Sequence, residues 1–174
     1  KFLAAYLLYN DGVQTVISVA AIFAAQELGM ETTQLILVIL MIQFVAFGGA
    51  LGFNWVANKI GTKQAILLSL IIWCGTTVYA FMGMKNTSIV LGIERRQLEF
   101  WVLAFVIALI LGGSQALSRS LFSLMIPKDQ EAEFYSFYEI SERGTSWLGT
   151  AIFGAVNQAF SSLRLGILSV IFFF

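Results

Sequence analysis

The sequence predicts an all-α fold, in which a polytopic bundle of helices crosses a lipid bilayer several times. Of its 174 residues, 59% are hydrophobic and 11% are charged, whereas a soluble domain carries about 25% charged residues. The hydrophobic residues form runs long enough to span a membrane, and short polar segments separate these runs. Only helices and closed barrels satisfy the backbone in lipid, and these runs are too uniformly apolar for barrel strands.

The six expected helices form a single transmembrane domain that covers residues 1–174, and we expect no β-sheet. They cover residues 2–26, 32–57, 63–84, 99–122, 132–160 and 163–174. The last run is shorter than the roughly 20 residues that a span requires. The chain also starts without Met, directly before an apolar run. We therefore expect a sequence that is cut at both ends, with a truncated last helix.

The orientation in the membrane is indicated by the connector between the second and third helices. Residues 58–63 are few and contain Lys59 and Lys63 but no acidic residue. Short cytoplasmic loops are enriched in Lys and Arg, so this hairpin is expected on the cytoplasmic side. The N-terminus and the loop at 127–131 should then lie on that side too.

Several kinds of chemistry are excluded by composition. The chain has no His, so neither a Ser-His-Asp triad nor a His-ligated metal site can form. Cys74 is the only cysteine and lies in an apolar run, where a small buried side chain is the simplest interpretation. The net charge is zero, and no basic block indicates nucleic acid. We expect no enzyme activity, no cofactor and no metal.

Ionisable residues within the expected spans are the candidate functional residues, because charge at membrane depth is costly. Asp11 lies in the first helix, and Glu139, Glu142 and Arg143 lie in the fifth. All four are expected roughly 10–17 Å from the same membrane surface. Their charges sum to −2, or −1 with Arg119 of the fourth helix, so at least one carboxylate should hold a proton at neutral pH. The alternative is that the group on the fifth helix only locks helix ends together.

Two spacing patterns add detail to this group. Glu139 precedes Arg143 by four residues, the favourable order for an ion pair, so Arg143 should pair with Glu139 or Glu142. Small residues predict close helix packing, at Gly48 and Gly52 with Gly49 alongside, and again at residues 112–113. The four Trp residues are expected at lipid-facing or interfacial positions.

Three segments resemble a known transporter family. They are Tyr9-Asn10-Asp11-Gly12, the run 112–122 that begins Gly-Gly-Ser-Gln, and the longer run 131–149. Together they resemble the autophagy-related vacuolar amino-acid effluxers and their bacterial relatives, a group in the major facilitator superfamily. The resemblance covers nearly the whole chain. It implies the second six-helix half of a twelve-helix carrier, with its last helix truncated.

The superfamily's hairpin motif, G-x-x-x-D-R-x-G-x-K, is partly present at residues 54–63. Gly61 and Lys63 match it, Lys59 replaces Arg, and Asn54 and Asn58 stand where Gly and Asp are usual. The resemblance therefore supports a cytoplasmic hairpin but not a charge-based latch at this place.

The resemblance also implies a function and a site. The function is secondary active transport of small solutes by alternating access, with amino acid efflux as the family activity. The first and fourth helices would line the central cavity. The candidate substrate-binding residues, chosen for their polarity at helical spacing on these two helices, are Asn10, Asp11, Gln14, Ser114 and Gln115, and they should face the cavity that the N-terminal half would close. The candidate proton-coupling or charge network, chosen for its ionisable residues within the expected spans, is Asp11, Arg119, Glu139, Glu142 and Arg143.

The implied partners are the small-molecule substrate, protons, the lipid bilayer and the N-terminal six-helix half of the carrier. The expected location is a multi-pass position in a membrane, with a bacterial inner membrane favoured over a vacuolar one. The competing interpretation is a receptor or scaffold on the same fold that does not transport.

Overall fold

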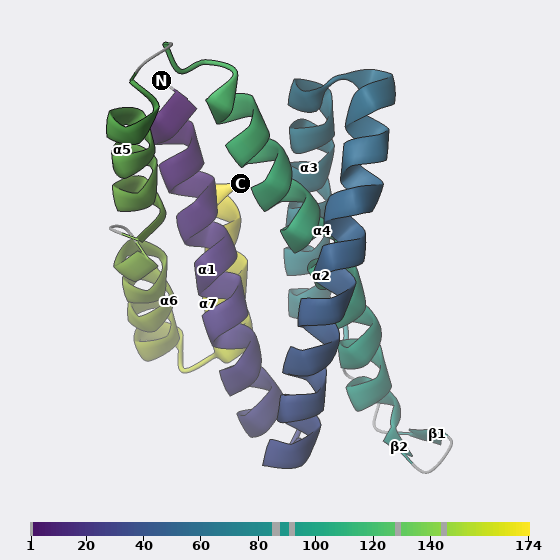
Figure 1. Ribbon diagram of the computed structural model, residues 1–174. Helices are drawn as coiled ribbons and strands as arrows, with labels where there is room; N and C mark the ends of the chain where they lie inside the picture. Colours follow the sequence, from purple (N-terminus) through teal and green to yellow (C-terminus); the bar gives the residue numbers. More distant parts are fainter. Residues whose placement is uncertain (1, 85–87, 91–92, 128–129, 144–145) are drawn as a thin grey trace.

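The computed structural model of the protein describes residues 2–84, 88–90, 93–127, 130–143 and 146–174 (Figure 1). The helices are α1 (Phe2–Gln26), α2 (Thr32–Ile60), α3 (Thr62–Met82), α4 (Arg95–Ser123), α5 (Glu131–Arg143), α6 (Ser146–Phe160) and α7 (Leu163–Ser169). A 3-10 helix, η1 (Val170–Phe173), follows α7, and two short strands, β1 (Ile89–Val90) and β2 (Ile93–Glu94), precede α4.

Four of the described helices, α1 to α4, are long and apolar enough to cross a membrane. The region expected as one helix from 132 to 160 is described as two helical segments, α5 and α6. The acidic residues Glu131 and Glu133 lie in the first turn of α5. The region expected as one final helix is α7 followed by η1.

The small hairpin before α4 differs from the expectation of no sheet. Strands β1 and β2 pair antiparallel, with Ile89 opposite Glu94 and Val90 opposite Ile93. Each strand has two residues. The hairpin lies at one end of the bundle, outside the long helices (Figure 1).

The two ends of the bundle agree with the predicted topology. Figure 1 shows the N-terminus, the turn from α2 to α3, the end of α4 and the start of α5 at the same end. The tight turn depends on Gly61, whose φ of 91° lies in the left-handed region that favours glycine. Its backbone N–H donates a hydrogen bond of 2.8 Å to the Ala57 carbonyl at the end of α2.

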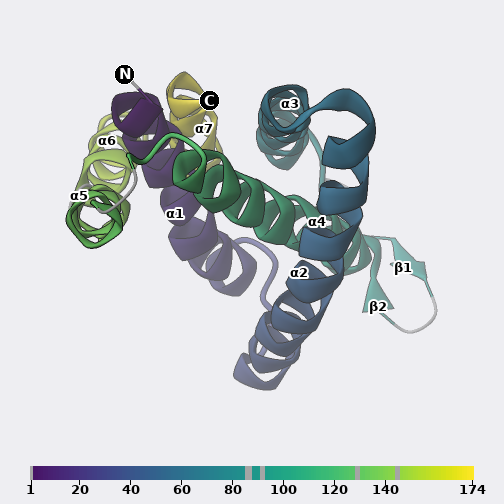
Figure 2. The same ribbon diagram turned by 45° about the horizontal axis from the view of Figure 1, so that its top comes forward.

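Helix α4 lies between two groups of helices. In the view of Figure 2, α1, α5, α6 and α7 lie on one side of it and α2 and α3 on the other. Glycines bring α2 and α4 together: a Cβ at Gly112 would overlap the Ala46 carbonyl, and a Cβ at Gly113 would overlap the Phe53 ring. The prediction of close packing is confirmed for residues 112–113.

The predicted packing role of Gly48 and Gly52 is wrong within this chain. A Cβ at either position would meet nothing within 4 Å, because both face outward, whereas Gly49 meets the backbone of Leu109 on α4. The sequence spacing identified the right part of α2 but the wrong face of it.

The hydrophobic core contains one tryptophan, which contradicts the expected lipid-facing position. Trp73 on α3 is 0% exposed, and its ring stacks on Phe174 with centroids 5.5 Å apart. The C-terminal segment covers this side of α3, which a sequence pattern cannot reveal. Trp55 and Trp147 are exposed, as expected.

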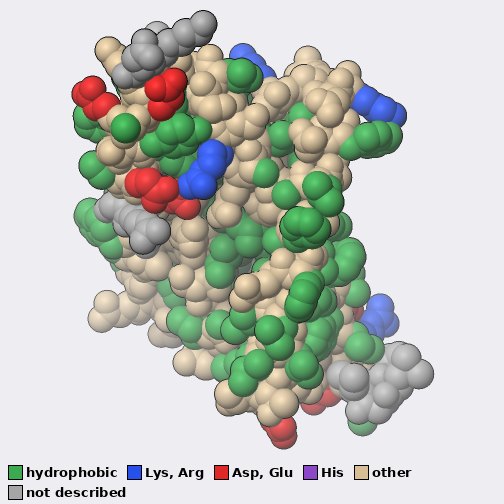
Figure 3. Space-filling view, viewed as in Figure 1, with side chains coloured by type: hydrophobic (Ala, Val, Ile, Leu, Met, Phe, Trp, Pro, Cys, Tyr) green, Lys and Arg blue, Asp and Glu red, His purple; other side chains and the backbone are tan. Residues whose placement is uncertain are grey.

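The outer surface of α2 is apolar. Phe44, Phe47, Leu51 and Trp55 are among its exposed side chains, and Figure 3 shows hydrophobic side chains spread along this part of the molecule. Such a surface suits contact with hydrocarbon or with another apolar helix.

Candidate functional site

Asn10 and Asp11 join α1 to the two segments α5 and α6. Each residue is 1% exposed. The Asn10 side-chain amide donates a 3.1 Å hydrogen bond to the backbone carbonyl of Glu142 on α5. Oδ2 of Asp11 accepts a 2.7 Å hydrogen bond from the backbone N–H of Gly149 on α6. The two polar side chains therefore point at helices of this same chain.

This orientation corrects one expectation. We expected Asn10 and Asp11 to face a cavity that the rest of the carrier would close, and such side chains would be exposed in this chain alone. They are buried instead, because α5 and α6 pack against this part of α1 (Figure 1). A direct role in substrate binding stays a prediction for both residues.

The second oxygen of each side chain has no hydrogen-bond partner. Oδ1 of Asn10 and Oδ1 of Asp11 are buried, and no described group donates to either one. Buried polar atoms are almost always paired, since an unpaired one costs free energy comparable to a lost hydrogen bond. A proton could satisfy the Asp11 carboxylate oxygen, and a hydrogen-bond donor on a bound polar molecule could satisfy either oxygen.

Arg119 on α4 joins two carboxylates of α5. Its Nη2 lies 3.0 Å from Oε1 of Glu139 and 3.7 Å from Oε2 of Glu142. The side chains of Arg119, Glu139 and Glu142 are 55%, 46% and 28% exposed, respectively. The structure thus brings together three of the predicted network residues. The side chain of Arg143 lies outside the described part, so its predicted ion pair stays a prediction.

Three tyrosines, which we did not predict, lie between the Asn10–Asp11 pair and the Arg119–Glu139–Glu142 group. The Tyr9 hydroxyl is hydrogen-bonded to the Ser118 hydroxyl on α4. Tyr6 stacks on Tyr138 of α5 with ring centroids 4.4 Å apart, and the Arg119 guanidinium lies 5.7 Å from the centre of the Tyr138 ring. The helical spacing of Tyr6 and Tyr9, and of Tyr135 and Tyr138, is a signal that could have indicated them.

The other predicted substrate contacts are not joined to Asn10 and Asp11. Ser114 is fully buried, and its hydroxyl donates a 3.2 Å hydrogen bond to the Leu111 carbonyl of its own helix. Gln14 and Gln115 are half-buried, one on α1 and one on α4. The five predicted binding residues therefore divide into three buried ones and two that reach the surface of this chain.

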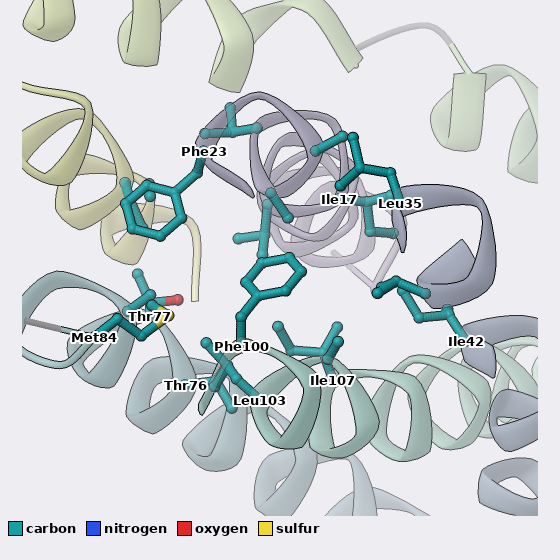
Figure 4. A pocket seen from close by; sticks show the side chains of 18 of the residues that line it. Ile17, Phe23, Leu35, Ile42, Thr76, Thr77, Met84, Phe100, Leu103 and Ile107 are labelled. Atoms are coloured by element: carbon teal, nitrogen blue, oxygen red, sulfur yellow. The ribbon is translucent and has the colours of Figure 1, made fainter. Parts of the chain in front are cut away.

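A separate cavity of about 170 Å³ lies among α1, α2, α3, α4 and α7 (Figure 4). Its lining is apolar and includes Phe23, Phe100 and Ile107, and none of the predicted site residues lines it. The Thr76 and Thr77 hydroxyls at its wall both donate to the Trp73 carbonyl. With its polar atoms already satisfied, this cavity does not suit a polar substrate.

Arg164, which we did not predict as a functional or structural residue, caps the C-terminal end of α3. Arg164 Nη1 donates to the carbonyls of Gly83 at 2.6 Å and Phe81 at 3.3 Å, and Nη2 donates to Met84 at 3.2 Å. Its Nε lies 3.8 Å from Oε2 of Glu27 at the end of α1. The last turn of α3 contains no basic residue, so Arg164 supplies the cation that a helix C-terminus favours.

Side chains of α4 secure the same end of the molecule. Arg96 donates a 3.0 Å hydrogen bond to the Glu27 carbonyl, and Gln97 donates a 3.1 Å hydrogen bond to the Leu28 carbonyl. Oε2 of Glu99 accepts a 3.0 Å hydrogen bond from the Met84 backbone N–H. This end is therefore tied together by polar contacts, and no group of three or more metal-ligating residues occurs in the described part of the chain.

Comparison with known proteins gives a family for this chain. The family model described as "Vacuole effluxer Atg22 like" matches residues 1–174. The chain therefore belongs to the Atg22-like family, which is a family of transporters and not of enzymes.

Relatives occur in fungi and in bacteria. Autophagy-related protein 22 of Pyricularia oryzae is 33% identical over 94% of this chain and 25% of its own length. The uncharacterized MFS-type transporter YxiO of Bacillus subtilis is 30% identical over 99% of this chain and 38% of its own length. The chain thus spans between a quarter and two-fifths of these relatives. No solved structure matches the chain.

Proposed function

We propose that this chain is the second six-helix half of a secondary active transporter, which moves small polar solutes by alternating access. Membership of the Atg22-like family supports transport, and four apolar spans support a multi-pass position in a membrane. Amino acids are the proposed substrates, because the sequence resembles vacuolar amino-acid effluxers. The N-terminal half of the carrier, which lies outside this chain, would complete the substrate passage.

The charged group on α4 and α5 supports the position of that passage. Arg119, Glu139 and Glu142 are partly exposed, whereas the exposed face of α2 carries large apolar side chains, and Figure 3 shows acidic and basic side chains gathered on the α5 side. Charged side chains that face lipid are costly, so they generally face water or protein. We place the water-filled passage, and the surface that the other half closes, along this face.

The predicted substrate-binding residues take two positions in this proposal. Gln14 and Gln115 are partly exposed, so their amide groups can contact the substrate directly. Asn10, Asp11 and Ser114 are buried. They would affect substrate binding indirectly, because they help to position α1 against α4, α5 and α6.

The observation that carries the transport mechanism is the environment of Asp11. Its carboxylate is buried in an apolar span and receives one hydrogen bond from a neutral backbone N–H, and no described group donates a hydrogen bond to its second oxygen. Arg119, the cation that could have compensated it, pairs with Glu139 and Glu142. A carboxylate in this position is suited to bind and release a proton, so we assign proton coupling to Asp11.

For the cellular location we propose the inner membrane of a bacterium rather than a vacuolar membrane. The Bacillus relative, which aligns with 99% of the chain, supports this choice.

The proposal is tested with the full-length carrier in liposomes. Amino acids are supplied in turn, with and without a pH gradient across the membrane. We expect at least one amino acid to accumulate against its gradient only while the pH gradient exists, and a protonophore should abolish that accumulation. Binding of a ligand without any transport would contradict the proposal and favour a receptor or scaffold on the same fold.

A further inference from the structure

An open groove runs along the outside of the molecule between α3 and α4. It encloses about 800 Å³ and is lined by one stripe of residues from each helix. The α3 stripe contains Ile72, Gly75 and Tyr79, and the α4 stripe includes Arg95 and Val102. The spacing of three to four residues places each stripe on one helix face, so the groove follows the helix axes.

The length of the groove matches one leaflet of a bilayer. Its α4 wall runs from Arg95 to Val106, which corresponds to about 16 Å at a rise of 1.5 Å per residue. The hydrocarbon core of a bilayer is about 30 Å thick, so one leaflet provides about 15 Å. With Arg95 at the level of the lipid headgroups, a groove of this length would reach about the middle of the membrane.

The polar residues of the groove are concentrated at its outer end. Arg95 is the first residue of α4, and its side chain is 54% exposed. Its Nε lies 3.1 Å from Oε1 of Glu99, and the two charges cancel. Tyr79 lines the same end, and tyrosine is enriched at the level of the headgroups. The remainder of the lining is apolar apart from Thr76, whose hydroxyl donates to the Trp73 carbonyl.

We propose that this groove binds one phospholipid with a zwitterionic headgroup. The acyl chain lies along the apolar stripes, the phosphate is bound by the Arg95 guanidinium, and the headgroup ammonium lies beside the Glu99 carboxylate. The neutral Arg95–Glu99 pair complements a headgroup that also carries one charge of each sign. This site is separate from the passage proposed for the substrate, and its test does not depend on transport.

Gly75 provides a sharp test of the groove. A Cβ added at Gly75 would meet nothing within 4 Å, so Gly75→Leu would place a side chain in the groove without a clash. Leu is also a better helix former than Gly, so folding should be preserved. Gly48→Leu on α2 is a matched control, because Gly48 has the same open surroundings but lies outside the groove.

The experiment uses the full-length carrier and a phosphatidylethanolamine with a photoactivatable group on one acyl chain. After illumination, cross-links are mapped by mass spectrometry. We expect adducts on residues of 72–79 and 98–106, loss of these adducts in Gly75→Leu, and unchanged adducts in Gly48→Leu. Arg95→Gln should weaken retention of the lipid roughly ten-fold, because it removes a charge-assisted hydrogen bond to the phosphate.

Three results would overturn the proposal. The first is an absence of adducts on both helices, which would show that another part of the carrier covers the groove. The second is labelling that Gly75→Leu does not change, which would indicate only general contact with boundary lipid. The third is stronger competition by phosphatidylglycerol than by unlabelled phosphatidylethanolamine, which would exclude the zwitterionic headgroup. The soluble headgroup glycerophosphoethanolamine should not compete.

Discussion

Asp11 and Gly149 are 138 residues apart in the sequence, yet the backbone N–H of Gly149 donates a 2.7 Å hydrogen bond to Oδ2 of Asp11. The contact depends on glycine, because a Cβ at this position would overlap Thr15 Oγ1 and lie 3.2 Å from Asp11 Oδ2. The same close approach of α1 and α6 buries the carboxylate. The packing of two helices and the environment of the proposed proton site are therefore one structural feature.

Gly149→Ala should lower the free energy of unfolding by about 1–3 kcal/mol, the usual cost of overpacking a tight contact. Thermal unfolding of the purified full-length carrier measures the effect. Gly154→Ala is the control on the same helix, since a Cβ there meets nothing within 4 Å. Adding Thr15→Ala to Gly149→Ala should recover part of the loss, because it removes the overlapping oxygen. Equal stability of the two single glycine variants would contradict the contact.

Arg164→Ala should destabilise the end of the bundle opposite the N-terminus by about 1.5–3 kcal/mol, because it removes charge-assisted hydrogen bonds to partly buried carbonyls. Arg164→Lys should lose less, since it keeps the charge but not the fork that contacts Gly83 and Met84 together. Lys59→Ala removes an exposed cation that lies 3.6 Å from the centre of the Trp55 ring, and should cost at most about 1 kcal/mol. A lower unfolding temperature for Lys59→Ala than for Arg164→Ala would contradict this account.

The proposed passage predicts which face of α5 meets water. In a Cys74→Ala background, Glu139→Cys should react with a charged, membrane-impermeant thiol reagent, because a thiol reacts as the thiolate and needs water to form it. Phe137→Cys should remain unlabelled, because Phe137 is exposed on nearly the opposite side of the same helix and should face lipid. Labelling of Phe137→Cys in preference to Glu139→Cys would contradict the proposal, because the water-filled passage would then lie on the Phe137 face of α5.

The sequence was sufficient for the helices because their signal is local. Long apolar runs predict α1 to α4 closely, and the polar connector with Gly61 predicts the turn between α2 and α3. The strands β1 and β2 were missed because two residues each are too few to produce a pattern. Trp73 was misplaced because its burial depends on Phe174, which lies far along the chain.

The candidate site was predicted in composition but not in its contacts. Burial cost alone identified Asp11, Glu139 and Glu142 as unusual residues in apolar spans. Their partners come from other helices: Gly149 for Asp11 and Arg119 for both glutamates. Helical spacing favours Arg143 as a further partner of Glu139, and that pair stays a prediction because the Arg143 side chain lies outside the described part of the chain. Arg164 gave no signal at all, since its partners are backbone carbonyls that every residue carries.

The most direct test of proton coupling at Asp11 is the Asp11→Asn variant of the full-length carrier in liposomes. Asn keeps the shape and an oxygen that can accept from Gly149, but it cannot release a proton. Uptake driven by a pH gradient and exchange of labelled for unlabelled substrate are measured side by side, with Glu133→Gln, an exposed acidic residue of α5, as the control. The account predicts loss of accumulation with exchange retained. Accumulation that survives in Asp11→Asn would remove Asp11 from the mechanism, and equal loss of both activities would assign it to binding or structure instead.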